Sequence, residues 1–432
     1  MNIVSTQSYE ILFSNNRDKY YFIILKNNPG RDFFLANISK DKIIDIEAKE
    51  SSLSETELIK RSGFLKKLKE KKIEAYYLNS LSSSPLDKWA KKNKIKLLSP
   101  TWALQKKLED KIFFDKLLKK NKVSSPFSVI PKKEKDIESI TKFPGVVQVP
   151  YSHGSQGTFL VKDKKEIFEL LKNKKMKFPF LYREFIKGLP VGVTLLLSKK
   201  EMIFSSIRGQ AIMLDSKNTN KYLGIQWMKT SEFKKEGIKN LNKTLISMGK
   251  VLQKLKLYGT ASIDLIIRDN DVFVIECNPR LSLSSIQMSQ RKELIHGYDF
   301  NEEFIKGLFG HKLSANKPFV PNTTYEGCTL DLDFFENKLS GKKTKRVHKI
   351  GMYKIKNGTL QYLSDKMKDF KNKDIIFVDH KLEKNVVLSP KDDYGMVISH
   401  HPVVKIEHGT FSIKDKNKIL AGIEKLLLSN TK

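Results

Sequence analysis

The sequence predicts a protein of mixed α/β and α+β class, built from three consecutive units. Over residues 1–108, short apolar runs alternate with helical stretches, which is the pattern of a parallel sheet covered by helices. Over 109–311, strands rich in Val and Ile, joined in part by hairpin turns, surround one long helical stretch. Residues 312–432 are mostly β in pattern and close with a helix.

Strands of the first unit are predicted where aromatic and β-branched residues cluster, at 20–25, 33–38, 42–47, 74–79 and 95–99. Helices are predicted at 54–68, after a Ser-rich cap region, and at 85–92. The run Asn27-Asn28-Pro29-Gly30 is a turn signal after the first strong strand. A plain connection is favoured there over a phosphate or substrate loop.

The second unit begins with a helical pattern over 101–120. A helix over 234–256 precedes a hairpin over 260–280. After Gly310 a polar, Pro-containing stretch suits a boundary between units, and the closing helix of the third unit is predicted over 414–428.

Composition indicates a soluble protein of enzyme size. With 40% hydrophobic residues among 432, the chain can bury two or three cores. No apolar run approaches the ~18 residues that cross a bilayer, and the first residues lack the layout of a signal peptide, so we expect a cytoplasmic location and no membrane partner. The two cysteines, Cys277 and Cys328, argue against a disulfide framework or a cysteine-rich zinc site.

The formal net charge of +32 raises the question of nucleic-acid binding, because basic surfaces attract phosphates. Of the 80 basic residues, however, only nine are Arg, the residue suited to bidentate phosphate and base recognition. The lysines alternate with apolar residues as on the wet faces of amphipathic helices. A Lys-rich solvated surface is therefore favoured over a polyanion-binding surface.

The strongest chemical pattern lies in the hairpin TASIDLIIRDNDVFVIECNPR. A three-residue turn at 269–271 would place Asp264 directly opposite Glu276, whereas a two-residue turn would put them on different faces. By the period of two, Asn278 shares the face of Glu276, together with Val272 and Val274. Two facing carboxylates and an amide are oxygen ligands of the kind that magnesium prefers.

Arg280 follows Asn278 by two residues and can extend a bidentate fork to a phosphoryl group or a carboxylate. The alternative is a surface hairpin with solvated acids and an Arg in an ordinary ion pair. The combination of an acid, an alternating strand and Glu-x-Asn-Pro-Arg favours a functional site.

At these residues the chain resembles the ATP-grasp family, in which a strand carrying an acid precedes a strand that ends Glu-x-Asn-x-Arg. The phrases Ile263-Asp264-Leu265 and Ile275-Glu276-Cys277-Asn278-Pro279-Arg280 carry the resemblance. It implies that Asp264, Glu276 and Asn278 hold Mg²⁺ and that Arg280 acts on the transferred phosphate. It also implies ATP as the cofactor, bound by a central domain with an antiparallel sheet.

The resemblance further implies the layout of the three units. Residues 1–108 would form a Rossmann-like domain, 109–311 the ATP-grasp domain with a lid at about 124–182, and 312–432 a C-terminal α+β domain.

Two cationic positions of the family lie upstream of the hairpin. Lys111, in Glu109-Asp110-Lys111, matches a lysine that contacts phosphate and is therefore a catalytic and ATP-binding candidate. From the pattern alone, Lys111 interrupts the apolar stripe of its helix, so snorkelling at the stripe edge is the alternative. Gln148 ends a strand where the family has a Lys; its amide can hydrogen-bond phosphate or adenine but carries no charge.

Two loops complete the expected nucleotide site. In Ser152-His153-Gly154-Ser155-Gln156-Gly157, the residues Gly154, Ser155 and Gly157 resemble a phosphate-covering lid, although a plain turn explains such a loop alone. His153 is favoured as a loop residue over a general base. The phrase FLYREFIKG resembles the adenine hinge, with Glu184, Phe185 and Ile186 at the base; the Glu184 C=O would accept from adenine and the Ile186 N–H would donate.

For the acid substrate, Arg208, Ser282 and Ser284 are candidates, with a surface salt bridge and helix capping as the alternatives. The resemblance implies a ligase that converts a small-molecule or peptide carboxylate into an acyl phosphate for attack by an amine. The alternatives are a non-catalytic nucleotide- or polyanion-binding protein on this scaffold and a bicarbonate-activating carboxylase. The sequence does not indicate the oligomeric state.

Overall fold

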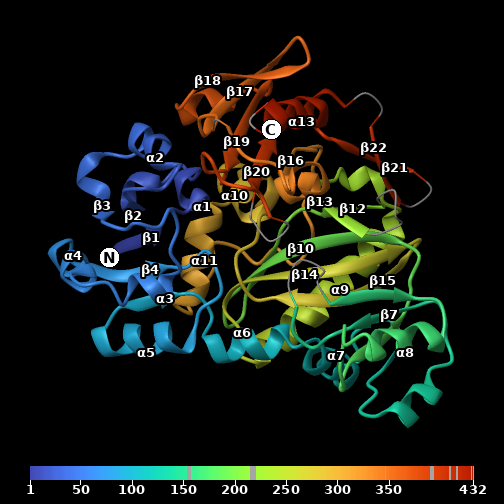
Figure 1. The fold of residues 1–432 in the computed structure, drawn as a ribbon. Helices are drawn as coiled ribbons and strands as arrows, with labels where there is room; N and C mark the ends of the chain where they lie inside the picture. The colour runs from blue at the N-terminus through green and yellow to red at the C-terminus, as the bar shows by residue number, and fades with distance from the viewer. Residues whose placement is uncertain are drawn as a thin grey trace.

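The computed structural model describes residues 1–152, 157–214, 220–345, 347–389, 394–407, 410–414, 417–429 and 431. Figure 1 shows the N-terminal unit in blue beside a large twisted sheet, a smaller sheet in teal and green below it, and the C-terminal unit in orange and red above. In the described part of the chain, no helix is both long and apolar enough to span a membrane.

The N-terminal sheet is parallel, with the order β3-β2-β1-β4-β5. Its strands are β1 Asn2–Thr6, β2 Tyr20–Leu25, β3 Ile43–Ile46, β4 Ile73–Tyr77 and β5 Lys96–Leu98. Its helices are α1 Tyr9–Leu12, α2 Arg31–Asn37, α3 Glu55–Leu58, α4 Phe64–Glu70 and α5 Ser84–Asn93. A separate apolar core covers each face of this sheet, and one of the two extends into the C-terminal unit.

Two expectations for this unit are wrong, and one strand was not predicted. Residues 33–37 lie in α2 and not in a strand, because Phe33 and Phe34 pack into an aromatic cluster with Tyr9. The helix expected at 54–68 is split into α3 and α4, and Gly63 at φ 76 lies at the break. The central strand β1 was not predicted at all.

The second unit opens with two helices, α6 Trp102–Glu109 and α7 Lys111–Lys120, so the single helix expected at 101–120 is broken at Asp110. A four-stranded sheet follows, with the order β6-β9-β7-β8. It contains β6 Ser128–Val129, β7 Gly145–Gln148, β8 Thr158–Val161 and β9 Leu181–Glu184, with α8 Lys164–Lys172 packed against it. This sheet has its own small core.

The largest sheet has eleven strands in the order β15-β14-β10-β12-β13-β16-β20-β19-β17-β18, with β11 beside β10. The strands of the second unit are β10 Leu189–Leu197, β11 Met202–Phe204, β12 Arg208–Leu214, β13 Asn220–Trp227, β14 Gly259–Arg268 and β15 Asp271–Asn278. Those of the third are β16 Cys328–Asp331, β17 Gly351–Lys356, β18 Thr359–Ser364, β19 Ile375–His380 and β20 Gly395–Ser399.

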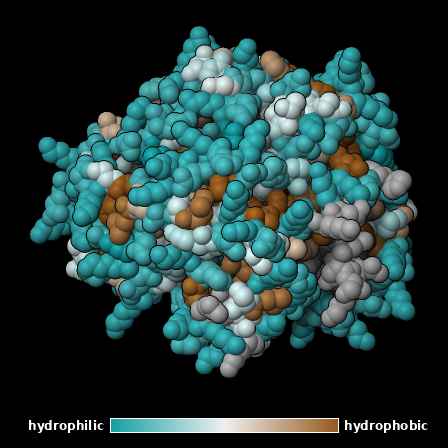
Figure 2. Space-filling view, turned by 90° about the horizontal axis from the view of Figure 1, so that it is seen from above, coloured by the Kyte–Doolittle hydropathy of each residue, from teal (hydrophilic) through white to brown (hydrophobic). Residues whose placement is uncertain are grey.

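Helices and a small hairpin complete the fold. The helices are α9 Lys235–Lys254, α10 Ser284–Gln290, α11 Phe300–Leu308, α12 Glu336–Leu339 and α13 Lys418–Ser429, and the hairpin joins β21 Val404–Glu407 to β22 Thr410–Ile413. Because the large sheet runs across residue 311, the predicted boundary there stays a prediction. Figure 2 shows one face covered mostly by hydrophilic side chains, with small hydrophobic patches between them.

Candidate functional site

The hairpin of β14 and β15 contains an irregularity that the sequence did not reveal. Arg268 pairs with Asp271, so the turn has two residues and not the three expected. The pairing then shifts between Leu265, which faces Val274, and Asp264, which faces Glu276. Ile275 is the extra residue, a β-bulge. The predicted pairing of Asp264 with Glu276 is therefore present, but the bulge produces it.

The bulge also corrects the predicted face of β15. Val272, Val274 and Cys277 point into the core, whereas Glu276 and Asn278 are only partly buried on the opposite face. Without an extra residue, the period of two would keep Glu276 on the face of Val272 and Val274. The expectation that these four residues share one face is wrong for that reason.

A row of four residues crosses the sheet at this point, from β12 through β10 and β14 to β15 (Figure 1). The row consists of Arg208, Gly192, Asp264 and Glu276. A cation and two carboxylates are thereby lined up across neighbouring strands, with a residue that lacks a side chain between Arg208 and Asp264.

Asp264 is the titratable group most affected by this arrangement. Burial raises its pKa from 3.8 to about 6, with Arg208 opposing the shift and Glu276 adding to it. A guanidinium nitrogen of Arg208 lies 3.7 Å from Oδ1 of Asp264 and donates to the Ser262 hydroxyl. Its second terminal nitrogen donates to Thr194 Oγ1 at 3.1 Å.

The raised pKa of Asp264 predicts a pH dependence of stability in the presence of a chelator. Between pH 3.8 and about 6, the folded carboxyl keeps a proton that the unfolded chain has released. The free energy of unfolding should therefore fall as the pH rises through this window and level off above it. Denaturant titrations check this: Asp264→Asn should lack this part of the slope, and equal slopes in both proteins would contradict it.

Gly192 makes room for the Arg208 side chain. A Cβ at this position would lie 2.6 Å from Nη2 of Arg208. Gly192→Ala should therefore displace the guanidinium and lower the free energy of unfolding by about 1–3 kcal/mol, measured by denaturant titration. Gly249→Ala in α9 is the control, because its Cβ would meet the flexible Met202 side chain at 3.1 Å. Equal losses in the two variants would contradict this role.

Lys111 is the first residue of α7 and lies at the acid pair. The Asp110 carboxylate caps this helix by accepting from the backbone N–H groups of Ile112 and Phe113. The Lys111 side chain is 4% exposed; its Nζ lies 3.5 Å from Oε1 of Glu276 and donates to the Ser152 C=O at 3.2 Å. The ammonium group is therefore not snorkelling into solvent.

Arg280 connects the end of β15 to α6. Its Nε donates to Oε1 of Glu109 at 3.0 Å, and its Nη2 donates to Oδ1 of Asn278 at 3.3 Å. Nε2 of Gln105 donates to the backbone C=O of the neighbouring Pro279 at 3.1 Å. Glu109 lies directly before Asp110 and Lys111 in the sequence, and nothing in the sequence indicates that it is the partner of Arg280.

Comparison with known proteins identifies the unit that carries these residues. Residues 108–284 match the model of the ATP-grasp domain. The chain contains an ATP-grasp domain. Among curated proteins, the carbamoyl phosphate synthase large chain of Clostridium botulinum is 26% identical over 266 residues. That stretch is 60% of this chain but 23% of the relative.

Solved structures resemble nearly the whole chain. The biotin carboxylase domain of the Hydrogenobacter thermophilus 2-oxoglutarate carboxylase has a TM-score of 0.64 at 13% identity, over 93% of this chain and 86% of that one. Biotin carboxylase from Campylobacter jejuni gives 0.63 at 12% identity, over 100% and 91%. N5-carboxyaminoimidazole ribonucleotide synthetase from Thermotoga maritima gives 0.56 at 14% identity, over 100% and 98%. The fold class predicted from the sequence is confirmed.

Asp264, Glu276 and Asn278 lie on one face of the β14–β15 hairpin. This face has the donor chemistry of a divalent-cation site. Asp264 and Glu276 face each other, and burial, with a smaller contribution from Glu276, raises the pKa of Asp264; a bound cation would favour the charged form of both carboxyls. Asn278 donates through Nδ2 to Oδ2 of Asp264 at 3.0 Å, while its Oδ1 accepts from Arg280. Since Arg only donates and a carboxylate only accepts, this amide orientation is fixed, and Asn278 would join a metal through the second lone pair of Oδ1.

The three candidate metal ligands are two carboxylates and one amide. Among the residues that the structure describes, no group of three or more His, Cys, Asp or Glu side chains is arranged to hold a metal. The metal assignment of Asp264, Glu276 and Asn278 therefore stays a prediction that the geometry suits.

Gln148 at the end of β7 is buried and accepts a hydrogen bond from Arg183 of β9 at 3.4 Å. A guanidinium thus lies beside Gln148, the residue at which the resemblance implied a lysine. Sequence reasoning missed Arg183, although it lies within the quoted hinge phrase FLYREFIKG. A single Arg in a strand gives no sign of whether it is buried or exposed.

The predicted adenine hinge follows β9. The Glu184 carboxylate accepts from the Phe127 N–H at 3.0 Å and from Lys142 Nζ at 3.1 Å. The Phe185 N–H donates to the Pro144 C=O, and the Phe185 ring is exposed. In the described part of the chain, the Ile186 N–H has no acceptor, so it is available for the adenine contact that the resemblance implies.

Of the predicted lid loop, Gly157 is described, whereas His153, Gly154 and Ser155 lie outside the described residues. Gly157 has φ 75, and a Cβ there would lie 2.5 Å from Val149. A glycine is therefore required at this point of the loop.

The two serines proposed for the acid substrate lie where β15 leads into α10. The hydroxyls of Ser282 and Ser284 are 2.8 Å apart, and the Ser282 N–H donates to Ser285 Oγ at 3.1 Å. Arg208 is separate from them and belongs to the Asp264 row. Among the described residues, no contact joins Arg208 to either serine, and the substrate role of all three stays a prediction.

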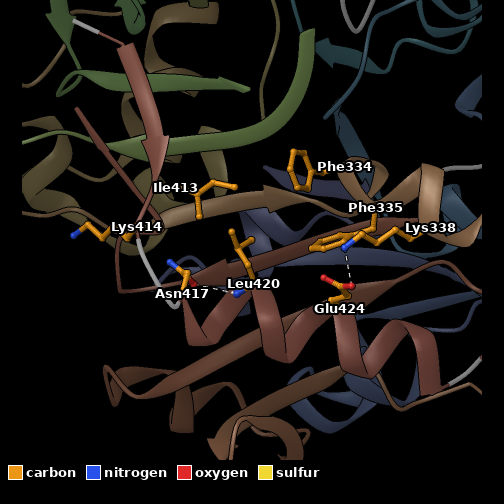
Figure 3. A pocket seen from close by; sticks show the side chains of 8 residues that line it. All are labelled: Phe334, Phe335, Lys338, Ile413, Lys414, Asn417, Leu420 and Glu424. Atoms are coloured by element: carbon orange, nitrogen blue, oxygen red, sulfur yellow. Dashed lines mark hydrogen bonds and ion pairs between the residues drawn. The ribbon is translucent and has the colours of Figure 1, made fainter. Parts of the chain in front are cut away.

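A cavity of about 450 Å³ lies elsewhere, between α12 and α13 of the C-terminal unit (Figure 3). Three charged residues, Lys338, Lys414 and Glu424, line it. Lys338 and Glu424 are paired at 2.7 Å, and Asn417 caps α13 by accepting from the Ile419 and Leu420 N–H groups.

Proposed function

We propose that this protein is an ATP-dependent ligase that activates a carboxylate as an acyl phosphate for attack by an amine. The observation that carries the proposal is the row of Arg208, Gly192, Asp264 and Glu276 with Lys111 at its end. The ATP-grasp domain match over residues 108–284 supports the use of ATP. Two of the similar structures were solved with MgADP and with β,γ-ATP, respectively, which supports nucleotide and Mg²⁺ as the ligands.

In this proposal Asp264, Glu276 and Asn278 hold Mg²⁺, and the adenine lies at Glu184, Phe185 and Ile186. Bound Mg²⁺ would neutralise charge on the β- and γ-phosphate oxygens. Lys111 and Arg280 are each paired with one acid, Glu276 and Glu109 respectively. Phosphate oxygens would compete with those acids for the same N–H donors.

The proposed reaction has two steps. A carboxylate oxygen of the substrate attacks the γ-phosphorus, and the bond to the β-phosphate oxygen breaks, which releases ADP and leaves an acyl phosphate. The amine nitrogen then attacks the acyl carbon, phosphate leaves, and the nitrogen loses a proton. Arg280 would stabilise charge on the transferred phosphoryl group, while the protein otherwise positions the reactants.

ADP release over a panel of amino acids, peptides and amines tests this function. We expect release that requires both an acid and an amine, with the amide product detected by mass spectrometry. Tight MgATP binding without turnover on any pair would instead favour a non-catalytic nucleotide-binding protein on this scaffold.

Bicarbonate activation is the second candidate. The carboxylase domain from Hydrogenobacter thermophilus was solved with MgADP and bicarbonate, and its fold covers 93% of this chain. Bicarbonate-dependent ADP release without any other acid would favour this reaction over the ligation of an organic acid.

A further inference from the structure

The bulge at Ile275 determines which face of β15 carries the acids. With the two-residue turn and no bulge, Glu276 and Asn278 would point to the side of Val272 and Val274, which is the core. An extra residue in a strand interrupts the ladder and leaves backbone groups that need other partners. The acid pair therefore depends on whatever satisfies the bulge.

Two groups from outside the hairpin satisfy it. The Ile275 C=O accepts from Nη1 of Arg183 at 2.8 Å. The Val274 N–H donates to the Ser124 C=O at 2.9 Å. Ser124 lies in the connection that follows α7, and Arg183 lies in β9 of the four-stranded sheet.

Arg183 is built into this position and is not a surface residue that happens to reach it. It is 2% exposed, and Asp115 beside it is 0% exposed. The Asp115 Oδ1 accepts from Nε and Nη2 of Arg183, both at 3.3 Å. Asp115 Oδ2 accepts from the Ser128 hydroxyl at 2.7 Å and lies 3.3 Å from Lys119. The planar guanidinium thus donates twice to Asp115 and also to Gln148 and Ile275, a fixed fork that a lysine ammonium group does not provide.

We propose that Arg183 is a positioning residue that holds the β15 bulge and thereby keeps Glu276 opposite Asp264. The role rests on the proposed function only in that the acid pair is taken as the cation site. Arg183 would touch neither substrate nor metal. It joins the four-stranded sheet, through β9, to the strand that carries the acids.

The same guanidinium fixes the Gln148 side chain. Since Arg donates only, the amide oxygen of Gln148 must face Arg183. In the described part of the chain, the amide nitrogen has no acceptor, although the side chain is 6% exposed. Gln148 therefore keeps two N–H donors for a ligand, which suits phosphate oxygens.

Hydrogen exchange of the ligand-free protein tests the structural part of the proposal. In Arg183→Met, amides of residues 272–278 should exchange about tenfold faster or more, because a hydrogen bond to a charged group is lost at the bulge. Arg268→Met removes an exposed Arg from the same hairpin, at the turn, and should leave these rates near wild type. Unchanged exchange at 272–278 in a folded Arg183→Met protein overturns the proposal.

A double-mutant cycle tests the link to Glu276. Titration of Mg²⁺ in the presence of ADP should show binding weakened about 10–100-fold in Arg183→Met, and little further loss when the change is made on Glu276→Gln. Additive losses would mean that Arg183 does not act through Glu276 and would overturn the proposal.

Removal of Arg183 leaves Asp115 buried without its main partner and can prevent folding. The paired variant Arg183→Met/Asp115→Asn removes both charges and is then used for the same measurements. If the wild-type protein binds no Mg²⁺-nucleotide, the proposed function fails, whereas exchange at residues 272–278 still decides the role of Arg183.

Discussion

Replacing Glu276 with Gln is expected to weaken Mg²⁺-dependent nucleotide binding by about 100-fold, the upper range for loss of a group that sets metal affinity. Gln keeps the shape of the side chain but removes one of the two facing carboxylates, so the cation would lose half of the charge that attracts it. The change also deprives Lys111 of its acid partner at 3.5 Å. Isothermal titration calorimetry with MgADP measures the effect.

Asp271→Asn is the matched control for this substitution. Asp271 lies on the same strand, but it is exposed at the turn and pairs with Arg268. We expect its MgADP affinity to stay near wild type. Equal losses in the two variants would mean that general charge, and not the acid pair, governs binding.

Arg280→Lys should lower turnover by about 100- to 1,000-fold, the cost of removing one preorganised donor from a developing negative charge. Arg280 already uses Nε for Glu109 and Nη2 for Asn278. In the described part of the chain, its Nη1 has no protein partner and is available to a phosphoryl oxygen. A lysine cannot make these contacts together.

The expected pattern for Arg280→Lys is a large fall in kcat with a smaller change in nucleotide affinity, because the contact develops during phosphoryl transfer. Steady-state ADP release measures both quantities. Arg268→Lys, at the exposed turn of the same hairpin, should leave both near wild type. A fall confined to nucleotide affinity would contradict a role in the transfer step.

The local sequence pattern predicted those elements in which the residue types favour a single kind of secondary structure. The strand at 20–25 and the hairpin at 260–280 are present because runs of β-branched and aromatic residues there form strands that are mostly buried. Phe33 and Phe34 have the same composition, yet they lie in a helix because their rings pack against Tyr9 of another helix. Such packing partners are distant in sequence and leave no local signal.

The facing acid pair was predicted from the sequence, but the prediction rested on a turn of the wrong length. Asp264 and Glu276 do face each other, but through a two-residue turn followed by the bulge at Ile275. A bulge depends on partners elsewhere, in this protein Arg183 and Ser124, and so cannot be derived from the hairpin sequence alone. The contact of Arg280 with Glu109 likewise joins elements far apart in sequence.

The central claim is that the face carrying Asp264 and Glu276 binds a nucleotide together with Mg²⁺. Calorimetric titration of the wild-type protein with ADP, with Mg²⁺ and then with excess chelator, tests it most directly. We predict one nucleotide per chain, with affinity that falls at least tenfold when Mg²⁺ is removed, as for a metal that bridges carboxylates and phosphates. Absence of nucleotide binding, or binding of the same strength in chelator, would contradict the claim.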